Sequence, residues 1–256
     1  MPQHWGPTPH VCRDRLGAVS VRSLGTPCLD DRDGAVALVP GLGAPGYLLR
    51  TVRTCARSGP VRVLDVPGFD DPAGLCCGAA LEPLAEVVAR WLAVVPPAPV
   101  VLAGHSTGAQ VALRAALRVP ERVRALVLLA PTFPRHLRRM GPLVGAFART
   151  AVHESPGVVP TLLPSYVRAG PRRLLSCIRS AQTDAPEDVL PSVACPVVVM
   201  SGEHDALCPP AWSRHLAGRA RQGRAVLVRG AHAFPHRHPA ATAAVLTAAR
   251  KRPTGK

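Results

Sequence analysis

Residues 100–108 read Val-Val-Leu-Ala-Gly-His-Ser-Thr-Gly, and this stretch decides the fold. Its first residues are apolar or small and predict a buried strand, which runs directly into a glycine–x–serine–x–glycine pattern. Thr107–Val119 follows with helical periodicity and stops at Pro120. A sharp turn from strand to helix holds the intervening serine in a strained conformation, with its hydroxyl above the sheet. The stretch therefore makes Ser106 a candidate nucleophile.

Short apolar segments alternate with helical segments on both sides of this turn. The predicted strands are Ala35–Val39, Val61–Val66, Val100–Ala103, Ala125–Leu129, Val197–Met200 and Ala225–Val228. The predicted helices are Pro83–Val95, Thr107–Val119, Pro210–Gly218 and Pro239–Arg250. Strands this apolar are typical of a parallel sheet that is buried on both faces. The order predicts an α/β fold with an open, mostly parallel sheet flanked by helices, to which Val19–Leu24 adds an antiparallel edge.

The segment 132–190 breaks this alternation. It contains no convincing strand, and its prolines divide it into several short helical pieces. A structureless loop of this length is uncommon in a compact domain, so a helical insertion over one end of the sheet is predicted. We therefore expect a core domain of residues 1–131 and 191–256 that carries a helical cap of residues 132–190.

A serine hydroxyl is a weak nucleophile and needs a histidine base with an orienting carboxylate. Asp205 and His232 each follow a predicted strand, at the edge of the sheet where the carboxyl ends of parallel strands gather. This position favours the catalytic set Ser106, Asp205 and His232. Other residues compete for the same roles, namely His204, His215, His236 and His238 as base and Glu203 as acid.

Taken together, the motifs resemble those of the α/β-hydrolase superfamily over roughly Gly34 to Pro239. The segments that carry the likeness are Gly104–Gly108, Ser201–Pro209, Gly230–Pro239 and Leu64–Asp70. They are similar to the nucleophile turn, the acid loop, the histidine loop and a D-x-P-G-F segment of that family. The resemblance implies the α/β-hydrolase fold, with the insertion as its cap.

The resemblance also implies an oxyanion hole made of two backbone N–H groups. One belongs to Thr107, directly after the candidate nucleophile. The other belongs to the loop after the strand Ala35–Val39, where Leu42 is the residue assigned. Many family members have His-Gly where this chain has Pro40-Gly41.

These residues predict a hydrolase that cleaves an ester-type bond of a small hydrophobic substrate through an acyl-enzyme intermediate. Tyr47, Trp212 and Phe234 lie beside the catalytic loops in sequence and are candidate substrate contacts. No cofactor and no metal is expected. Two alternatives stay open. The same triad is suited to thioester or carbon–carbon bond hydrolysis or to acyl transfer, and a catalytically silent α/β-hydrolase fold can serve as a binding protein.

The chain has a formal net charge of +15, from 31 Lys and Arg against 16 Asp and Glu. Arginine accounts for 29 of these 31 cations, asparagine is absent, and alanine, glycine and proline are abundant. This bias is typical of a GC-rich coding sequence, and no nucleic-acid motif accompanies it. We therefore expect no nucleic-acid partner, and the basic end Arg250–Lys256 is interpreted as a solvated tail.

Targeting and redox features are weak. Residues 1–20 lack the apolar centre of a signal peptide, and no apolar run reaches the length of about 18 residues that a membrane helix needs. The eight cysteines form no C-x-x-C pattern, which favours free thiols. The sequence predicts a cytoplasmic protein without a membrane span, and it leaves the oligomeric state open.

Overall fold

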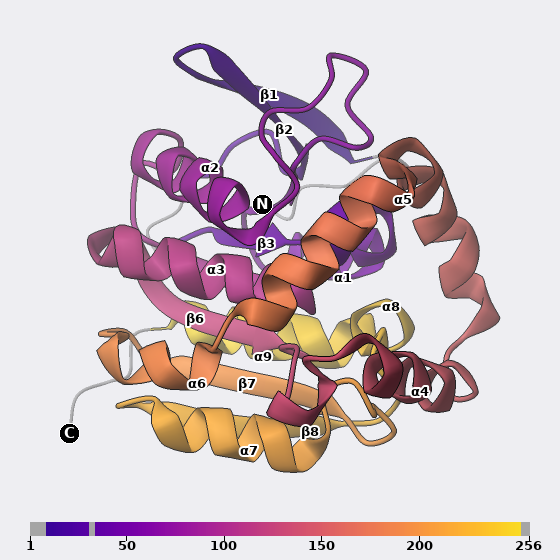
Figure 1. Cartoon of the computed structure of the whole chain (residues 1–256). Helices are drawn as coiled ribbons and strands as arrows, with labels where there is room; N and C mark the ends of the chain where they lie inside the picture. The colour runs from indigo at the N-terminus through magenta and orange to yellow at the C-terminus, as the bar shows by residue number, and fades with distance from the viewer. Residues whose placement is uncertain (1–8, 31–33, 252–256) are drawn as a thin grey trace.

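The computed structural model describes residues 9–30 and 34–251, and its centre is an eight-stranded sheet (Figure 1). The strands are β1 (His10–Leu16), β2 (Val19–Gly25), β3 (Val36–Val39), β4 (Val61–Asp65), β5 (Val100–His105), β6 (Val123–Leu129), β7 (Val197–Gly202) and β8 (Gly223–Val228). Their order across the sheet is β1-β2-β4-β3-β5-β6-β7-β8. All neighbouring strands from β3 to β8 pair in parallel. The pairs β1–β2 and β2–β4 are antiparallel. The predicted fold class is confirmed.

Two of the expectations about edge strands are wrong. Val19–Leu24 forms β2, which pairs with β4 on one side and with β1 on the other, so that β1 is the edge. The segment Ala225–Val228 was expected to be buried on both faces. It lies in β8, whose residues are exposed or half-buried because this strand forms the opposite edge.

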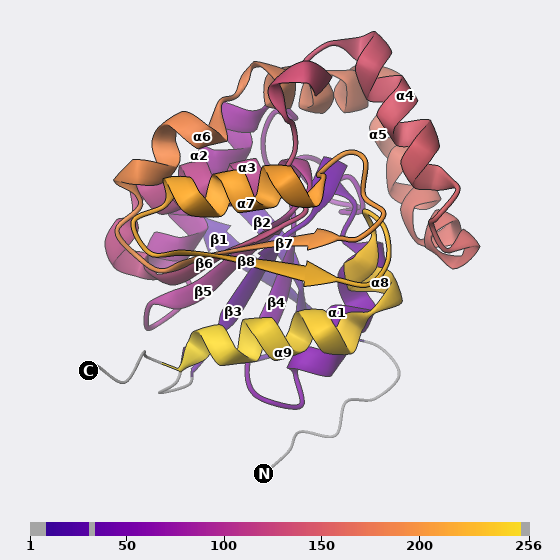
Figure 2. The same ribbon diagram turned by 90° about the horizontal axis from the view of Figure 1, so that it is seen from below.

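Helices cover both faces of the sheet (Figure 2). One layer contains α2 (Leu81–Val94), α3 (Thr107–Arg118) and α7 (Pro210–Arg219), and the other contains α1 (Leu49–Cys55) and α9 (Pro239–Arg250). Central strands between these layers are fully buried, as all four residues of β3 and all six of β5 are. This burial of apolar strands on both sides forms the main core and fixes the positions of the loops at the strand ends.

Between β6 and β7 every residue is described, and the chain there forms helices and loops without a strand. The helices are η4 (Arg135–Leu137), α4 (Met140–Ala151), η5 (Pro156–Val158), α5 (Val159–Thr183), α6 (Pro186–Val189) and η6 (Leu190–Ser192). Helices α4 and α5 lie beyond the carboxyl ends of β7 and β8 (Figure 2). The division into a core of 1–131 and 191–256 and a cap of 132–190 stays a prediction, and residues 1–8, 31–33 and 252–256 of that core lie outside the described part.

The cap contains a longer helix than its prolines suggest. The expectation of separate pieces holds at Gly170 (φ 71°, ψ 162°), directly before Pro171, where the backbone of the 25-residue α5 is not helical, and it is wrong at Pro160 and Pro164, which do not divide the helix. Pro171 starts the second part, where a missing N–H is harmless because the first turn of a helix has no internal acceptor for it. Pro164 lies inside the first part and removes only its own bond to the preceding turn.

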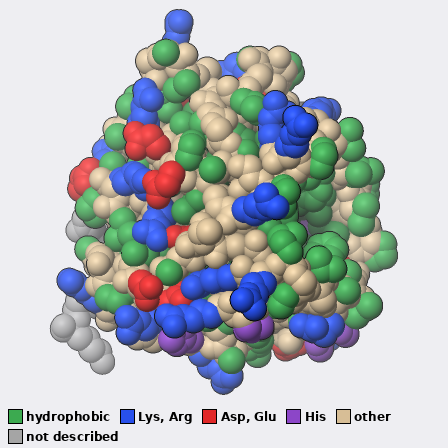
Figure 3. Space-filling model, in the orientation of Figure 1, with side chains coloured by type: hydrophobic (Ala, Val, Ile, Leu, Met, Phe, Trp, Pro, Cys, Tyr) green, Lys and Arg blue, Asp and Glu red, His purple; other side chains and the backbone are tan. Residues whose placement is uncertain are grey.

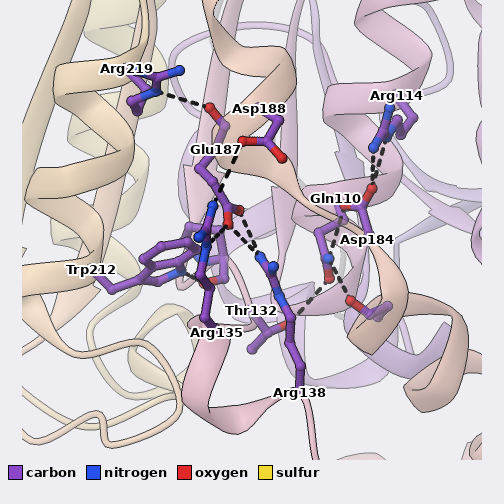
Figure 4. Close-up of polar contacts among 12 residues, drawn as sticks. Gln110, Arg114, Thr132, Arg135, Arg138, Asp184, Glu187, Asp188, Trp212 and Arg219 are labelled. Atoms are coloured by element: carbon purple, nitrogen blue, oxygen red, sulfur yellow. Dashed lines mark hydrogen bonds and ion pairs between the residues drawn. The ribbon is translucent and has the colours of Figure 1, made fainter.

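Ion pairs join the two ends of the predicted cap to each other and attach its end to the core (Figure 4). Arg135 and Arg138 converge on Glu187, with Nε–Oε1 and Nη2–Oε2 distances of 3.0 and 2.6 Å. Asp184 accepts two bonds from Arg114 on α3. Both carboxylates are buried, so these pairs are little screened by salt and fix the return of the chain to β7.

All eight cysteines have free thiols, as predicted. Among residues 9–30 and 34–251, no helix combines the length and the apolar character needed to cross a bilayer. Part of the N-terminal segment and residues 252–256 of the basic end lie outside the described residues. The interpretation of Arg250–Lys256 as a solvated tail is wrong for Arg250, which ends α9, is buried and donates from Nη1 to the Ser58 carbonyl at 2.9 Å.

Candidate active site

The serine at the turn between β5 and α3 has the strained backbone that the sequence predicts. Ser106 has φ 57° and ψ −127°, a region that residues other than glycine rarely occupy. Its N–H donates to the Leu129 carbonyl at 2.9 Å. Two neighbouring strand ends thus hold the turn, and the serine hydroxyl lies at the carboxyl edge of the sheet.

The structure brings Ser106, His232 and Asp205 together, although they lie far apart in the sequence. His232 Nε2 is 2.9 Å from Ser106 Oγ, and His232 Nδ1 is 2.8 Å from Asp205 Oδ2. The other oxygen of Asp205 accepts from the N–H groups of Leu207 and Cys208 at 2.8 and 3.0 Å. These bonds fix the orientation of the carboxylate against the His232 ring.

The environment of His232 raises the pKa of its imidazole ring. Burial disfavours the charged ring, but the Asp205 carboxylate on Nδ1 outweighs burial and raises the pKa of His232 above its usual value. Glu154 in the cap acts in the same direction. A base with a pKa above the usual histidine value accepts a proton readily, which suits it to activate a hydroxyl.

The competing histidines have other contacts. His204 stacks on His153, and His215 stacks on Trp212. His236 is buried, with Nδ1 3.3 Å from the Tyr47 carbonyl. Among the histidines of the described residues, a hydrogen bond to Ser106 Oγ is found only for His232.

The loop after β3 approaches the serine from the other side. Leu42 has φ 46°, and its N–H donates to the Thr107 hydroxyl at 2.9 Å. Thr107 is the first residue of α3, so its own N–H has no acceptor one turn earlier in the helix. The two N–H groups that the resemblance implies therefore flank Ser106, and that of Leu42 is bonded to the Thr107 side chain.

A buried hydrogen-bond chain connects this loop with the histidine loop. The Gly41 N–H donates to Tyr47 Oη at 2.9 Å, Tyr47 Oη lies 2.7 Å from His105 Nδ1, and His105 Nε2 lies 2.8 Å from the His232 carbonyl. Burial, with His232 nearby, lowers the pKa of His105 to about 3, so the ring is neutral.

The carbonyl at the end of this chain determines the direction of every bond. A carbonyl only accepts, so Nε2 of the neutral His105 carries the proton and Nδ1 accepts from Tyr47. Tyr47 Oη in turn accepts from Gly41. The chain fixes the backbones of the two loops that flank Ser106. No sequence pattern indicates a role for His105, which occupies a variable position of its motif.

A cavity of about 530 Å³ opens above the serine. Ser106, His232, Leu42 and Thr107 line it together with Tyr47. Most of the other lining side chains are apolar and come from the cap, among them Phe133, Met140, Leu143, Val144, Phe147, Val158, Val159, Leu162 and Ile178. Such a cavity is large enough for a small organic ligand that is mainly apolar.

Two of the three predicted substrate contacts lie elsewhere. Trp212 and Phe234 are not among the residues that line this cavity. The Trp212 indole donates to the Pro131 carbonyl at 3.1 Å, and Phe234 is completely buried beside His105. Closeness in sequence to a catalytic loop did not predict where these side chains point.

The cap contributes one polar residue that sequence reasoning missed. Glu154 lines the cavity, and its carboxylate accepts from the Ala233 N–H at 2.7 Å. It therefore holds the residue directly after His232. Among the described residues, no group of three or more His, Cys, Asp or Glu is arranged to hold a metal ion.

A family model described as "Alpha/beta hydrolase family" matches residues 36–245. Pimeloyl-[acyl-carrier protein] methyl ester esterases of Neisseria meningitidis are similar in sequence. The serogroup C protein is 28% identical over 82% of this chain and 91% of its own length. The serogroup A protein is 29% identical over 73% of this chain, and the match spans 66% of that protein.

Solved structures share the fold. A thermophilic esterase from Thermogutta terrifontis has a TM-score of 0.70 at 22% identity and covers 93% of this chain and 96% of its own. An E-2-(acetamidomethylene)succinate hydrolase has a TM-score of 0.69 at 16% identity and covers 94% and 98%. The family match extends over most of the chain and includes Ser106, Asp205 and His232. The chain belongs to the α/β-hydrolase family and is a hydrolase.

Proposed function

We propose that this hydrolase cleaves carboxylic esters with an apolar acyl chain, through a triad of Ser106, His232 and Asp205. The observation that carries the proposal is the pair of hydrogen bonds, 2.9 and 2.8 Å long, that joins the three side chains at the base of an apolar cavity. Nucleophile, base and orienting acid are thus within reach of a bound carbonyl group.

In the first step, Ser106 Oγ attacks the ester carbonyl carbon while His232 Nε2 takes the serine proton. The tetrahedral intermediate collapses, the ester C–O bond breaks, and the proton passes from His232 to the departing alcohol. Water then attacks the acyl-enzyme with His232 again as base, which releases the carboxylic acid and restores the serine. Asp205 keeps the imidazole oriented and stabilises its charged form throughout.

The oxyanion of each intermediate is placed against the N–H groups of Leu42 and Thr107. An oxyanion carries more charge than a hydroxyl, so it displaces the Thr107 side chain as acceptor of the Leu42 N–H. Backbone donors held in this way stabilise the transition state more than the neutral ester. The replacement of His-Gly by Pro40-Gly41 leaves the Leu42 donor in place, because its N–H lies two residues further on.

The cavity supports an acyl chain as the part of the substrate that is recognised. Its lining is mainly aliphatic and aromatic. The similar proteins from Neisseria meningitidis are named as esterases of a pimeloyl-[acyl-carrier protein] methyl ester, an ester of an acyl chain, which supports this assignment. We place the acyl chain in the cavity and the small alcohol portion toward the opening.

A series of p-nitrophenyl esters of rising chain length tests the proposal. Each additional buried methylene contributes about 0.8 kcal/mol, so kcat/KM should rise about fourfold per methylene until the cavity is full. A rate that is independent of chain length would contradict the assignment of the cavity. Thioester analogues and competing alcohol acceptors in the same assay would identify thioester hydrolysis or acyl transfer instead.

The pH profile is expected to report His232. Since only the neutral ring accepts a proton, kcat/KM should fall about tenfold per pH unit on the acid side of a pKa above the ordinary histidine value of about 6.5. Glu154→Gln removes one charge that raises this pKa, so its acid limb should move to lower pH. Glu203→Gln is the control, and the acid limb of its kcat/KM profile should lie at the same pH as that of the parent. Equal profiles for all three proteins would show that Glu154 has no influence on the base.

A further inference from the structure

Exposed apolar side chains concentrate on the cap. Among the described residues, eleven large hydrophobic side chains are exposed, and seven of them lie between residues 140 and 167. The seven are Met140, Val144, Phe147, Val152, Val159, Leu163 and Val167, with exposed fractions from 40 to 78%. An exposed group of this kind marks an interaction surface rather than the scattered apolar residues of an ordinary surface. We call these seven residues the cap patch.

Helical spacing explains how the cap patch forms. Met140, Val144 and Phe147 are separated by four and three residues on α4, and Val159, Leu163 and Val167 are four apart on α5. Each set therefore shares one face of its helix. The space-filling view shows apolar side chains gathered over α4 and the first part of α5, beside a hollow (Figure 3).

The cap patch continues into the cavity. Met140, Val144, Phe147 and Val159 are exposed to solvent and also line the space above Ser106. An apolar molecule therefore meets an unbroken apolar path from the outer surface of the cap to the nucleophile. If the patch rested on an apolar phase, such a molecule would enter the cavity without first being transferred into water.

The charge beside the cap patch is strongly positive. Residues 135–183 contain eight arginines and one carboxylate, Glu154, which is bonded to the Ala233 N–H. Arg139, Arg149 and Arg172 are exposed, and no carboxylate of the described residues lies within ion-pair distance of them. Guanidinium groups beside an apolar surface match an interface that presents phosphates above hydrocarbon.

An apolar patch beside exposed arginines favours one kind of binding partner. A second copy of the chain would bring like-charged arginines together around the apolar contact, at a cost in free energy. An anionic lipid surface satisfies both features, since it accepts apolar side chains at the level of the headgroups and arginines at the phosphates. We propose that the cap patch docks on an anionic lipid surface and presents the cavity opening to it.

Vesicle binding tests the proposal without any reaction. Full-length Ser106→Ala protein is mixed with vesicles of phosphatidylcholine alone or with added phosphatidylglycerol, and bound protein is measured by sedimentation. Each arginine near an anionic surface contributes about fivefold in affinity, so three predict binding about 100-fold tighter to the anionic vesicles. This preference should weaken as salt is added.

Leu163→Ser/Val167→Ser changes the patch at two positions that do not line the cavity and should reduce vesicle binding at least about tenfold. Val94→Ser/Leu227→Ser, at two exposed apolar positions outside the cap, is the matched control and should bind like the parent. Thermal melting verifies that each variant is folded.

Three results would overturn the proposal. The first is no binding to anionic vesicles, and the second is equal binding by both double variants. The third is a dimer in light scattering that Leu163→Ser/Val167→Ser converts to monomer, since it would assign the patch to a second copy. Because binding is measured on a protein without the nucleophile, failure of the proposed esterase activity leaves this test intact.

Discussion

Replacing Ser106 with alanine is expected to lower kcat/KM for nitrophenyl esters by about 10⁴-fold or more. The substitution removes the oxygen that lies 2.9 Å from His232 Nε2 and leaves the cavity lining and both backbone donors in place. Substrate binding should therefore change little, and the loss should appear in kcat. Steady-state kinetics of both proteins on one ester measure the effect.

Ser155→Ala is the matched control, because Ser155 is also a serine of the cavity lining but makes no hydrogen bond to His232. Its kcat/KM should stay within about threefold of the parent. A fluorophosphonate probe should label the parent and Ser155→Ala but not Ser106→Ala. Retained activity in Ser106→Ala would disprove the triad, and a folded parent that resists labelling would favour a catalytically silent binding protein.

Gly104→Ala is expected to destabilise the protein by ~3 kcal/mol or more. A Cβ at this position would lie 2.1 Å from the Gly108 carbonyl oxygen and 2.7 Å from the Ala109 Cα. These are backbone atoms in the first turn of α3, so they cannot move aside as a flexible side chain would. The melting temperature should fall by about 6–12 °C for a chain of this size.

Gly218→Ala tests whether this effect comes from the close approach of strand and helix. Gly218 lies in α7, and a Cβ there would meet no atom within 4 Å. Alanine has the better helix propensity, so this variant should be neutral or up to about 1 kcal/mol more stable. If Gly104→Ala and Gly218→Ala have the same melting temperature, close packing at the nucleophile turn is not the reason for glycine at position 104.

Much of the fold follows from local patterns. The strands that become β3 to β7 are apolar because they are buried on both faces, and buried strands stand out in a sequence. β1 has no such pattern, since it lies at the sheet edge and is largely exposed. The seven-residue α1 is short and contains Thr51, Val52 and Thr54, which have weak helix propensity.

The residues of the candidate site also divide into those that local patterns predict and those whose positions depend on how the chain packs. Ser106, Asp205 and His232 were predicted because each follows a parallel strand, and such strands end at one edge of the sheet. Glu154 was missed because its role depends on how the cap folds over the core. Trp212 was misplaced because the orientation of α7 decides where its side chain points, and sequence distance carries no information on that.

The hydrogen-bond chain from Gly41 to His232 also limits how the sequence can diverge. Loss of the Tyr47 hydroxyl alone leaves the Gly41 N–H and His105 Nδ1 without partners, at about 1–3 kcal/mol for each buried group. Loss of the His105 ring alone leaves the Tyr47 hydroxyl without an acceptor and the His232 carbonyl without a donor. Replacing both side chains with apolar ones leaves the Gly41 N–H and the His232 carbonyl without partners, so the double change should cost about as much as either single one. The side chains of Tyr47 and His105 are therefore energetically coupled, and once one of them is lost, loss of the other should add little further destabilisation.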